Sequence, residues 1–360
     1  MQENQSNSLD DDDGAPGWDA IDGALFPLYG ETKPQHMGTV LPYMFGGPDP
    51  LDGISIYQRT EPVPHWHYVT YGFSELYAKE SEDPACSGYG IELTFRLRAH
   101  EDDTSAPIWA ISFLQNLARY VFETGNVFSP GDRMSANGPI AVEMPTAICA
   151  MAFVQDPELP PTDTANGHLT FLQVVGLTVE EEQAAKHWQT DKMLQALLTH
   201  MPLWVTDLGR ASLLNNPAIM AEIQAGTERD GSSSGAIYTA VLTVRERKHL
   251  LRATVVEVEM GAHQIIDVCA LLPLRIPFEQ PYFVNGPDWQ IRFEPGKECG
   301  VKKEERVLIV TMDAACARAF AGTVLAKAGR YQLAALPTVV WQVKQTLIKD
   351  ANGSVVRTVG

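Results

Sequence analysis

Two histidines, His65 and His67 within PHWHYVTYGF, are the residues of this chain whose types and spacing most suggest catalysis. Because residues two apart on a strand point to the same face, both imidazoles are predicted to lie on one side and could share a metal ion. No third ligand follows them at a metal-type spacing. Structural histidines at the start of a strand are the alternative, and a metal-dependent enzyme using both residues is kept as a second hypothesis.

Two other catalytic patterns are missing from the sequence. It contains no HExxH, and no GxGxxG opens a helix. The segment GGPDPLD (46–52) lacks the Lys-Ser/Thr pair of a phosphate loop, and it is interpreted as a turn in which Asp49 and Asp52 cap backbone amides. The hypothesis that follows is a binding protein without catalytic residues, metal site or cofactor.

The net charge of the chain limits the kinds of molecule that it is expected to bind. The formal net charge is −18, from 45 acidic and 27 Lys and Arg residues, and no block of the chain is strongly basic. Nucleic acid is excluded as a partner, since phosphate binding needs clustered cations. A basic protein or peptide segment would be attracted instead.

The N-terminus and the cysteines indicate the compartment. The start, MQENQSNSLDDDDGAPG, has neither a basic nor an apolar region, so no signal peptide is predicted. No window of about 18 apolar residues exists to span a membrane. Five widely separated cysteines form no CxxC pair, which is typical of a reduced, soluble, cytoplasmic protein.

A length of 360 residues predicts two domains. Residues 1–16 are expected to be a disordered acidic tail, residues 17–240 an N-terminal domain, and residues 241–360 a smaller C-terminal α+β domain. The stretch GTERDGSSSG (226–235) is interpreted as a linker or loop. Hydrophobic periodicity predicts the main helices at 106–124, 179–200 and 314–328. Their end signals are Gly125 after the first helix, a capping box of Thr178 and Glu181 at the start of the second, and Asp313 as the N-cap of the third.

Strand-like runs separate these helices in irregular order, so the predicted class is α+β with mixed sheets. Enrichment in β-branched and aromatic residues predicts the strands. They are expected at 54–59, 66–73, 91–98, 146–154, 169–178, 236–244, 251–259, 268–275, 289–293, 306–311 and 339–348.

Several motifs, in this order and spacing, resemble the Suppressor of fused family. They cover most of residues 18–240 and include YMFGGPDPLDGISIY (43–57), PHWHYVTYGFSELY (64–77), SGYGIELTFRLR (87–98) and NLARYVFETGNVFSPGD (116–132). The resemblance implies two mixed α/β-sheet domains that form a clamp. The C-terminal part resembles the family weakly and lacks the long acidic insertion of the animal members, which is typical of the compact bacterial form.

The resemblance also implies a binding mode. In animal members, the cleft between the domains holds an extended partner segment that adds as a β-strand. The matching segments here are Asn126–Asp132 and the run that begins at Ala236 and includes Tyr238. Tyr120 and Asp132 match family residues that grip the partner. The alternative for these two is a tyrosine on the core face of a helix and an aspartate that caps a turn.

The resemblance leaves two further roles open, an immunity protein and a scaffold. For bacterial relatives, the family's proposed role is as an immunity protein that recognises a toxin domain, and an acidic protein would attract a basic toxin. The third hypothesis is a scaffold or oligomer-forming protein with no ligand in the cleft.

Overall fold

The computed structural model describes residues 14–39, 41, 43–100, 103–142, 144–249, 252–349 and 353–360. The acidic tail predicted at residues 1–16 therefore lies mostly outside the described residues. The chain divides into two compact units, and each is described by itself. Unit 1 comprises Met1–Glu182 with Leu194–Asn215, and unit 2 comprises Gln183–Met193 with Asn216–Gly360.

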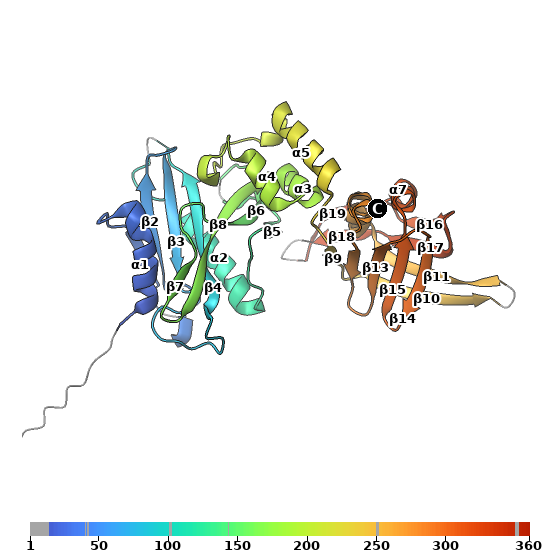
Figure 1. Ribbon diagram of the computed structural model, residues 1–360, viewed down its shortest axis with the longest axis horizontal. Coiled ribbons are helices and arrows are strands. Elements are labelled where there is room, and N and C mark those ends of the chain that lie inside the picture. Colours follow the sequence, from blue (N-terminus) through green and yellow to red (C-terminus); the bar gives the residue numbers. More distant parts are fainter. Residues whose placement is uncertain are drawn as a thin grey trace, which may run out of the picture. The chain divides into compact units, whose positions relative to one another are not determined.

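Unit 1 is built on one mixed sheet with the strand order β1-β2-β3-β4-β8-β6-β5, and β7 pairs with β8 (Figure 1). Its strands are β1 (Gln35–Gly38), β2 (Gly53–Arg59), β3 (His65–Tyr71), β4 (Cys86–Arg98), β5 (Arg133–Ser135), β6 (Ile148–Gln155), β7 (Thr162–Thr164) and β8 (Gly167–Thr178). Its helices are α1 (Pro16–Tyr29), η1 (Tyr43–Phe45), α2 (Trp109–Thr124), η2 (Pro202–Trp204) and η3 (Leu213–Asn215). The parallel pair β4/β8 joins two antiparallel halves of the sheet.

The two long helices cover opposite faces of this sheet (Figure 1). Successive side chains of a strand point to opposite faces, so each face has its own core. Val69 and Tyr71 of β3 pack with α1, whereas Trp66 and Tyr68 pack with α2. The predicted end of α2 is confirmed at Gly125, whose φ of +71° suits glycine.

The predicted helix 179–200 is wrong as a single element. The structure has α3 (Val179–His187) and α4 (Thr190–Leu197), and the division between the units falls within this stretch. The predicted capping box is confirmed, because the Thr178 N–H donates to Glu181 Oε2 at 3.0 Å and the Glu181 N–H donates to Thr178 Oγ1 at 3.4 Å. Asp191 lies in the first turn of α4, where an acidic side chain favours a helix start.

Unit 2 contains the sheets β10-β11-β17-β16 and β14-β15-β13-β12-β9, and the hairpin β18-β19. Its strands are β9 (Ala236–Tyr238), β10 (Leu242–His249), β11 (Arg252–Gly261), β12 (Tyr282–Asn285), β13 (Gln290–Pro295), β14 (Gly300–Glu304), β15 (Val307–Met312), β16 (Gly329–Leu333), β17 (Leu336–Lys344), β18 (Thr346–Lys349) and β19 (Val355–Val359). Its helices are α5 (Pro217–Asp230), α6 (Ala262–Leu271), η4 (Leu272–Leu274), η5 (Ile276–Phe278) and α7 (Ala314–Thr323).

One hydrophobic core joins the two large sheets of unit 2. Trp341 of β17 lies with its ring centroid 5.9 Å from that of Phe293 of β13 and 4.9 Å from that of Phe320 of α7. Residues from both sheets and a helix therefore share one aromatic cluster. The predicted α+β class with mixed sheets is confirmed.

Four predictions in unit 2 are corrected. The single strand predicted at 236–244 is divided between β9 and β10, and the one predicted at 339–348 is divided between β17 and β18, in each case in different sheets. The strand predicted at 268–275 is wrong, because these residues lie in α6, η4 and the residue after it. The buried residues Ala262, Ile265, Val268 and Leu271 recur every three positions, which is a helical spacing. The helix predicted at 314–328 ends at Thr323.

Within the residues that the structure describes, none of the helices combines the length and the apolar character needed to cross a membrane.

Candidate partner-binding edges

Strand β5 forms an edge of the sheet of unit 1 at the end of the predicted segment Asn126–Asp132. It pairs with β6, and none of the described residues adds a strand on its other side. The Phe153 N–H donates to Asp132 O and the Ala136 N–H donates to Cys149 O, both at 2.9 Å. Backbone groups alternate along an antiparallel strand, so those of Ser135 point away from β6. The strand thus presents backbone groups at an open edge.

Tyr120 lies in the last turns of α2 and is partly buried. Its ring stacks on Phe128 with the centroids 5.5 Å apart, and Phe128 in turn stacks on Phe153 of β6 at 4.0 Å. Asn126 Nδ2 donates to the Tyr120 hydroxyl at 3.5 Å. Phe128 therefore holds one face of the Tyr120 ring against the core of unit 1, close in the sequence to β5.

Asp132 is exposed and stabilises the turn before β5. Its Oδ2 accepts a hydrogen bond from the Ser129 N–H at 2.8 Å, and its own N–H donates to Ser129 O at 3.0 Å. The structure thus gives Asp132 the turn-capping contact that was the alternative to partner binding. The exposed carboxylate also places a negative charge beside β5.

Strand β9 is the matching edge in unit 2. It pairs in parallel with β12, and the described part of the chain offers no strand on its other side. The Phe283 N–H donates to Gly235 O at 2.8 Å, and the Thr239 N–H donates to Asn285 O at 2.9 Å. By alternation, Ala236 and Tyr238 direct their backbone groups away from β12. The Tyr238 side chain is 81% exposed.

The predicted linker or loop at 226–235 is wrong for its first half and confirmed as a loop for its second half. Residues 226–230 belong to α5, and residues 231–235 (GSSSG) connect α5 to β9. The hydroxyls of Ser232 and Ser234, both buried, donate to Lys186 O at 2.6 and 2.8 Å. GSSSG has the Gly-x-Ser-x-Gly spacing of a hydrolase nucleophile elbow, but an elbow joins a strand to a following helix, the reverse order. The serines fix the start of β9.

The two histidines are buried in unit 1, with exposed fractions of 0%. The Tyr29 hydroxyl lies 2.6 Å from His67 Nδ1, and His65 Nδ1 donates to Val63 O at 2.7 Å. His67 Nε2 lies 3.6 Å from Asp156 Oδ2. Over the described ranges, no group of three His, Cys, Asp or Glu side chains is arranged to hold a metal ion. Among the described residues, the structure therefore shows no third ligand for a metal ion bound by His65 and His67.

Arg96 supplies the positive charge of this buried network. Its Nη1 lies 2.6 Å from Asp156 Oδ2 and its Nη2 lies 3.0 Å from Glu158 Oε2. Burial, reinforced by the Arg96 charge, lowers the pKa of His67 to about 4. Burial alone would raise the pKa of Asp156, but His67 and Arg96 outweigh it and hold that pKa well below its ordinary value. A neutral His67 accepts from the Tyr29 hydroxyl at Nδ1, so the network links α1 to the sheet.

Glu92 lies in β4 and is fully buried, in an environment that no sequence pattern predicted. Its carboxylate accepts hydrogen bonds from Thr70 Oγ1 at 2.6 Å, from the Gly72 N–H at 3.0 Å, and from the N–H and hydroxyl of Ser74 at 2.9 and 2.6 Å. Burial nevertheless raises the pKa of Glu92 to about 7. Glu92 therefore anchors the turn that follows β3.

The amide capping predicted for Asp49 and Asp52 in the turn at residues 46–52 is wrong for both side chains among the described residues. Asp49 forms an ion pair with Arg119 of α2. The side chain of Asp52 caps no amide of the described chain, although its backbone N–H donates to Tyr71 O at 2.9 Å.

Known proteins resemble this chain in sequence and in fold. Residues 47–211 match the family model described as Suppressor of fused protein (SUFU). The human Suppressor of fused homolog is 34% identical over 240 residues, an alignment that covers 61% of this chain and 49% of the human protein. The chain thus aligns with about half the length of that relative.

Two solved structures extend the comparison. Drosophila Suppressor of Fused has a TM-score of 0.79 at 21% identity, and the match covers 92% of this chain and 97% of that chain, which shows the shared fold. A chain of the Sufu-Fu complex has a TM-score of 0.55 at 30% identity, over 58% of this chain and 98% of that chain. The bacterial form stays a prediction, since the relatives named here are animal proteins. Residues 47–211 of this chain belong to the Suppressor of fused family.

Proposed function

We propose that this chain is a non-enzymatic, cytoplasmic protein-binding module, which holds an extended partner segment by β-strand addition. The observation that carries the proposal is the position of β5 and β9. Each lies at the edge of its own sheet, at or beside a segment that the family resemblance selected. An edge strand supplies backbone donors and acceptors to a new strand, and neighbouring side chains select its sequence.

Side chains beside both edges suit a basic segment. Asp132 carries an exposed charge next to β5, and charge-assisted hydrogen bonds to carboxylates favour Lys, Arg or His. Tyr120 and Tyr238 offer aromatic surface beside the two edges. The chain's net charge of −18 would also speed association with a basic partner.

The related proteins support protein binding as the general activity. One structure with the same fold is that of a Sufu-Fu complex, which is a fact about that protein and its partner. A single segment held in a cleft between the two domains, and an immunity role against a toxin, remain finer forms of the proposal.

The test compares backbone variants with side-chain controls. The chain is used to capture partners from its own host, and mass spectrometry identifies them. Calorimetry then measures their affinity for Ser135→Pro and Ala236→Pro, each of which removes one N–H that points to an open edge, as edge strands tolerate. Ser135→Ala and Ala236→Ser retain those N–H groups and serve as controls.

We expect at least one proline variant to bind the partner about tenfold more weakly or worse, a loss of about 1.4 kcal/mol, while both controls bind normally. Alanine at Tyr120 and arginine at Asp132 then test the neighbouring side chains. Wild-type affinity in both proline variants would remove the strand-addition proposal.

A further inference from the structure

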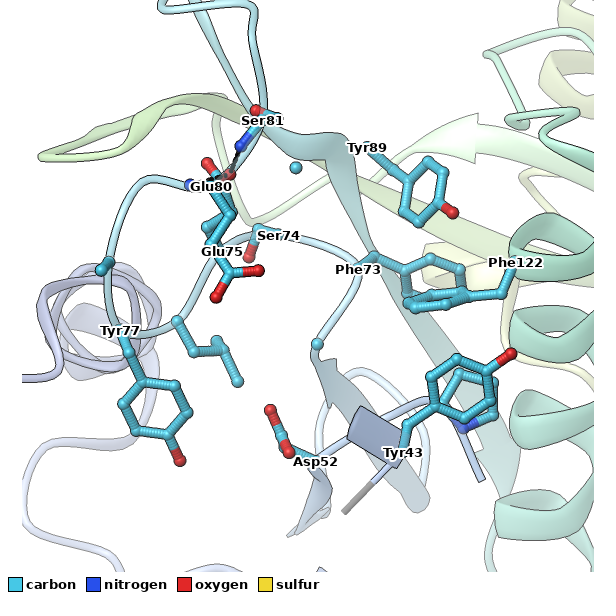
Figure 2. Close-up of a pocket in the computed structure, with 15 residues that line it drawn as sticks. Tyr43, Asp52, Phe73, Ser74, Glu75, Tyr77, Glu80, Ser81, Tyr89 and Phe122 are labelled. Carbon is cyan, nitrogen blue, oxygen red and sulfur yellow. Dashed lines mark hydrogen bonds between the residues drawn. The ribbon is translucent and has the colours of Figure 1, made fainter. Parts of the chain in front are cut away.

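A pocket with a volume of about 510 Å³ lies in unit 1 (Figure 2). This volume is within the range of about 300–1,000 Å³ that is typical of ligand sites. Its walls come from the turn after β3 (residues 72–78, with 80 and 81), from η1, from Pro50 and Asp52 before β2, from the start of β4 and from the last turns of α2. None of its lining residues belongs to β5 or to unit 2, so the pocket is separate from the proposed edges.

Four aromatic side chains form one side of the pocket, here called the aromatic wall: Tyr43, Phe73, Tyr89 and Phe122. Phe122 lies at its centre, with ring centroids 4.9 Å from Tyr89, 5.5 Å from Tyr43 and 6.1 Å from Phe73. Figure 2 shows these rings grouped together on one side of the space. The faces of such rings carry partial negative charge and attract cations.

The charged side chains that line the pocket are all carboxylates: Asp52, Glu75 and Glu80. Glu75 already has a cation, because Lys79 Nζ lies 3.0 Å from its Oε2. Asp52 differs, since its carboxylate has no hydrogen bond or ion pair with any residue that the structure describes. Figure 2 shows Asp52 between Tyr43 and Tyr77, with its carboxylate directed into the space.

Asp52 is half-buried, and this burial raises the pKa of its carboxyl group. Burial without a polar partner disfavours the charged form, and a cation at the same place would reverse that effect. An anion would be repelled by the lining carboxylates, and an uncharged apolar ligand would dehydrate Asp52 further.

We propose that this pocket binds an organic cation, an ammonium or guanidinium group, between the Asp52 carboxylate and the aromatic wall. The group would be carried by a Lys or Arg side chain of a protein partner or by a free small amine. Both sources present the same charge to the same contacts.

Amide chemical shifts in ¹H–¹⁵N NMR spectra of the full chain provide the test, with Gly72, Ser74 and Gly88 reporting on the pocket. The probes are the N-acetyl methylamides of lysine, arginine and norleucine, together with n-butylammonium. We expect saturable shifts of the pocket amides with the cations and at least tenfold weaker binding of norleucine, which lacks the charge. Tighter binding of a lysine-containing hexapeptide than of n-butylammonium would indicate a protein source, and the reverse order a small amine.

Two variants test the named contacts. Asp52→Asn keeps the shape but loses the charge, and we expect it to weaken cation binding at least tenfold. Phe122→Leu keeps apolar volume but removes the central ring, and serves as well if Asp52→Asn fails to fold. The matched control is Glu298→Gln, an exposed carboxylate in unit 2 that gives the same change in net charge.

Two results would overturn the proposal: norleucine binding as tightly as lysine, or full affinity in both variants. Ser135→Pro should bind the cations normally, so a failure of the strand-edge proposal and a failure of this one can be distinguished.

Discussion

Glu92→Gln is the perturbation whose effect the structure defines most sharply. Glu92 is fully buried, and burial raises its pKa from 4.5 to about 7. Glutamine retains an oxygen that can accept from the Gly72 and Ser74 amides, but it cannot titrate. The variant therefore isolates the cost of keeping a charged carboxylate inside unit 1.

Proton linkage gives the sign and the size of the effect. A carboxyl group whose pKa is higher in the folded than in the unfolded state takes up a proton more readily when folded. Its stabilisation is complete below pH 4.5 and is lost as the pH rises to about 7. A shift of this size corresponds to about 3 kcal/mol, at about 1.4 kcal/mol per pKa unit. Wild type should lose about 3 kcal/mol relative to the variant between pH 4.5 and 8.

His67 contributes the opposite dependence over nearly the same range. Burial lowers its pKa from 6.5 to about 4, so its contribution is complete above pH 6.5 and is lost as the pH falls to 4. The two effects partly cancel in wild type. In the Glu92→Gln variant, His67 acts without this compensation, together with His65, whose pKa burial also lowers to about 4, and stability should rise with pH up to about 6.5.

The assay is hydrogen exchange measured by mass spectrometry at several urea concentrations between pH 4.5 and 8. Peptides from β3 and β4 report the free energy of unfolding of unit 1 directly. Glu298→Gln, at an exposed position, is the control and should follow the wild-type curve. Parallel curves for wild type and Glu92→Gln would show that the buried carboxyl group does not titrate as argued.

Three further variants test a buried ion pair and two glycines in helices. Asp156→Asn should lower the stability of unit 1 by about 3 kcal/mol in the same assay, because Arg96 would lose its fully buried counter-charge and keep only that of the partly exposed Glu158. Gly226→Ala in α5 should destabilise unit 2 by about 1 to 3 kcal/mol, since the new Cβ would lie 2.1 Å from the Trp188 ring. Gly322→Ala in α7 meets nothing within 4 Å and should stabilise unit 2 by up to about 1 kcal/mol in urea denaturation, so equal effects of the two alanines would contradict this reasoning.

Local sequence patterns correctly predicted several helix ends and strands. The capping box at Thr178, the αL end at Gly125 and the N-cap at Asp313 are confirmed, the last by a 2.7 Å hydrogen bond from the Cys316 N–H. The strands expected at 54–59 and 91–98 are also present in β2 and β4. Each of these signals depends on a few neighbouring residues.

The wrong predictions arose where tertiary packing decides between alternatives. The apolar run at 268–275 fits a strand or a buried helix equally well, and packing in the core of unit 2 selects α6 and η4. The serines of GSSSG favour a flexible loop in isolation, but the Lys186 carbonyl gives two of them buried partners. No local pattern specifies such a distant partner.

The candidate sites also depend on tertiary structure that local sequence patterns do not predict. The family resemblance, and not residue spacing, selected the segments at β5 and β9, and strand order is a non-local property that places both at edges. The unpaired carboxylate of Asp52 had no signal at all, because its environment combines η1, the turn after β3, β4 and α2. Asp49, three residues earlier in the same turn, forms an ion pair with Arg119 instead.

The short length of β5 and β9 limits the binding free energy that backbone hydrogen bonds of an added strand can contribute. Strands β5 and β9 have three residues each, and short edge strands protect a sheet from uncontrolled pairing. Since alternate residues point outward, β9 presents the backbone of Ala236 and Tyr238, about four hydrogen-bonding groups. At about 1 kcal/mol each, these would give about 4 kcal/mol, which corresponds to a Kd of about 1 mM. A tighter complex must therefore take most of its affinity from side chains beside the edge, and Tyr238→Ala should cost more than any single backbone hydrogen bond.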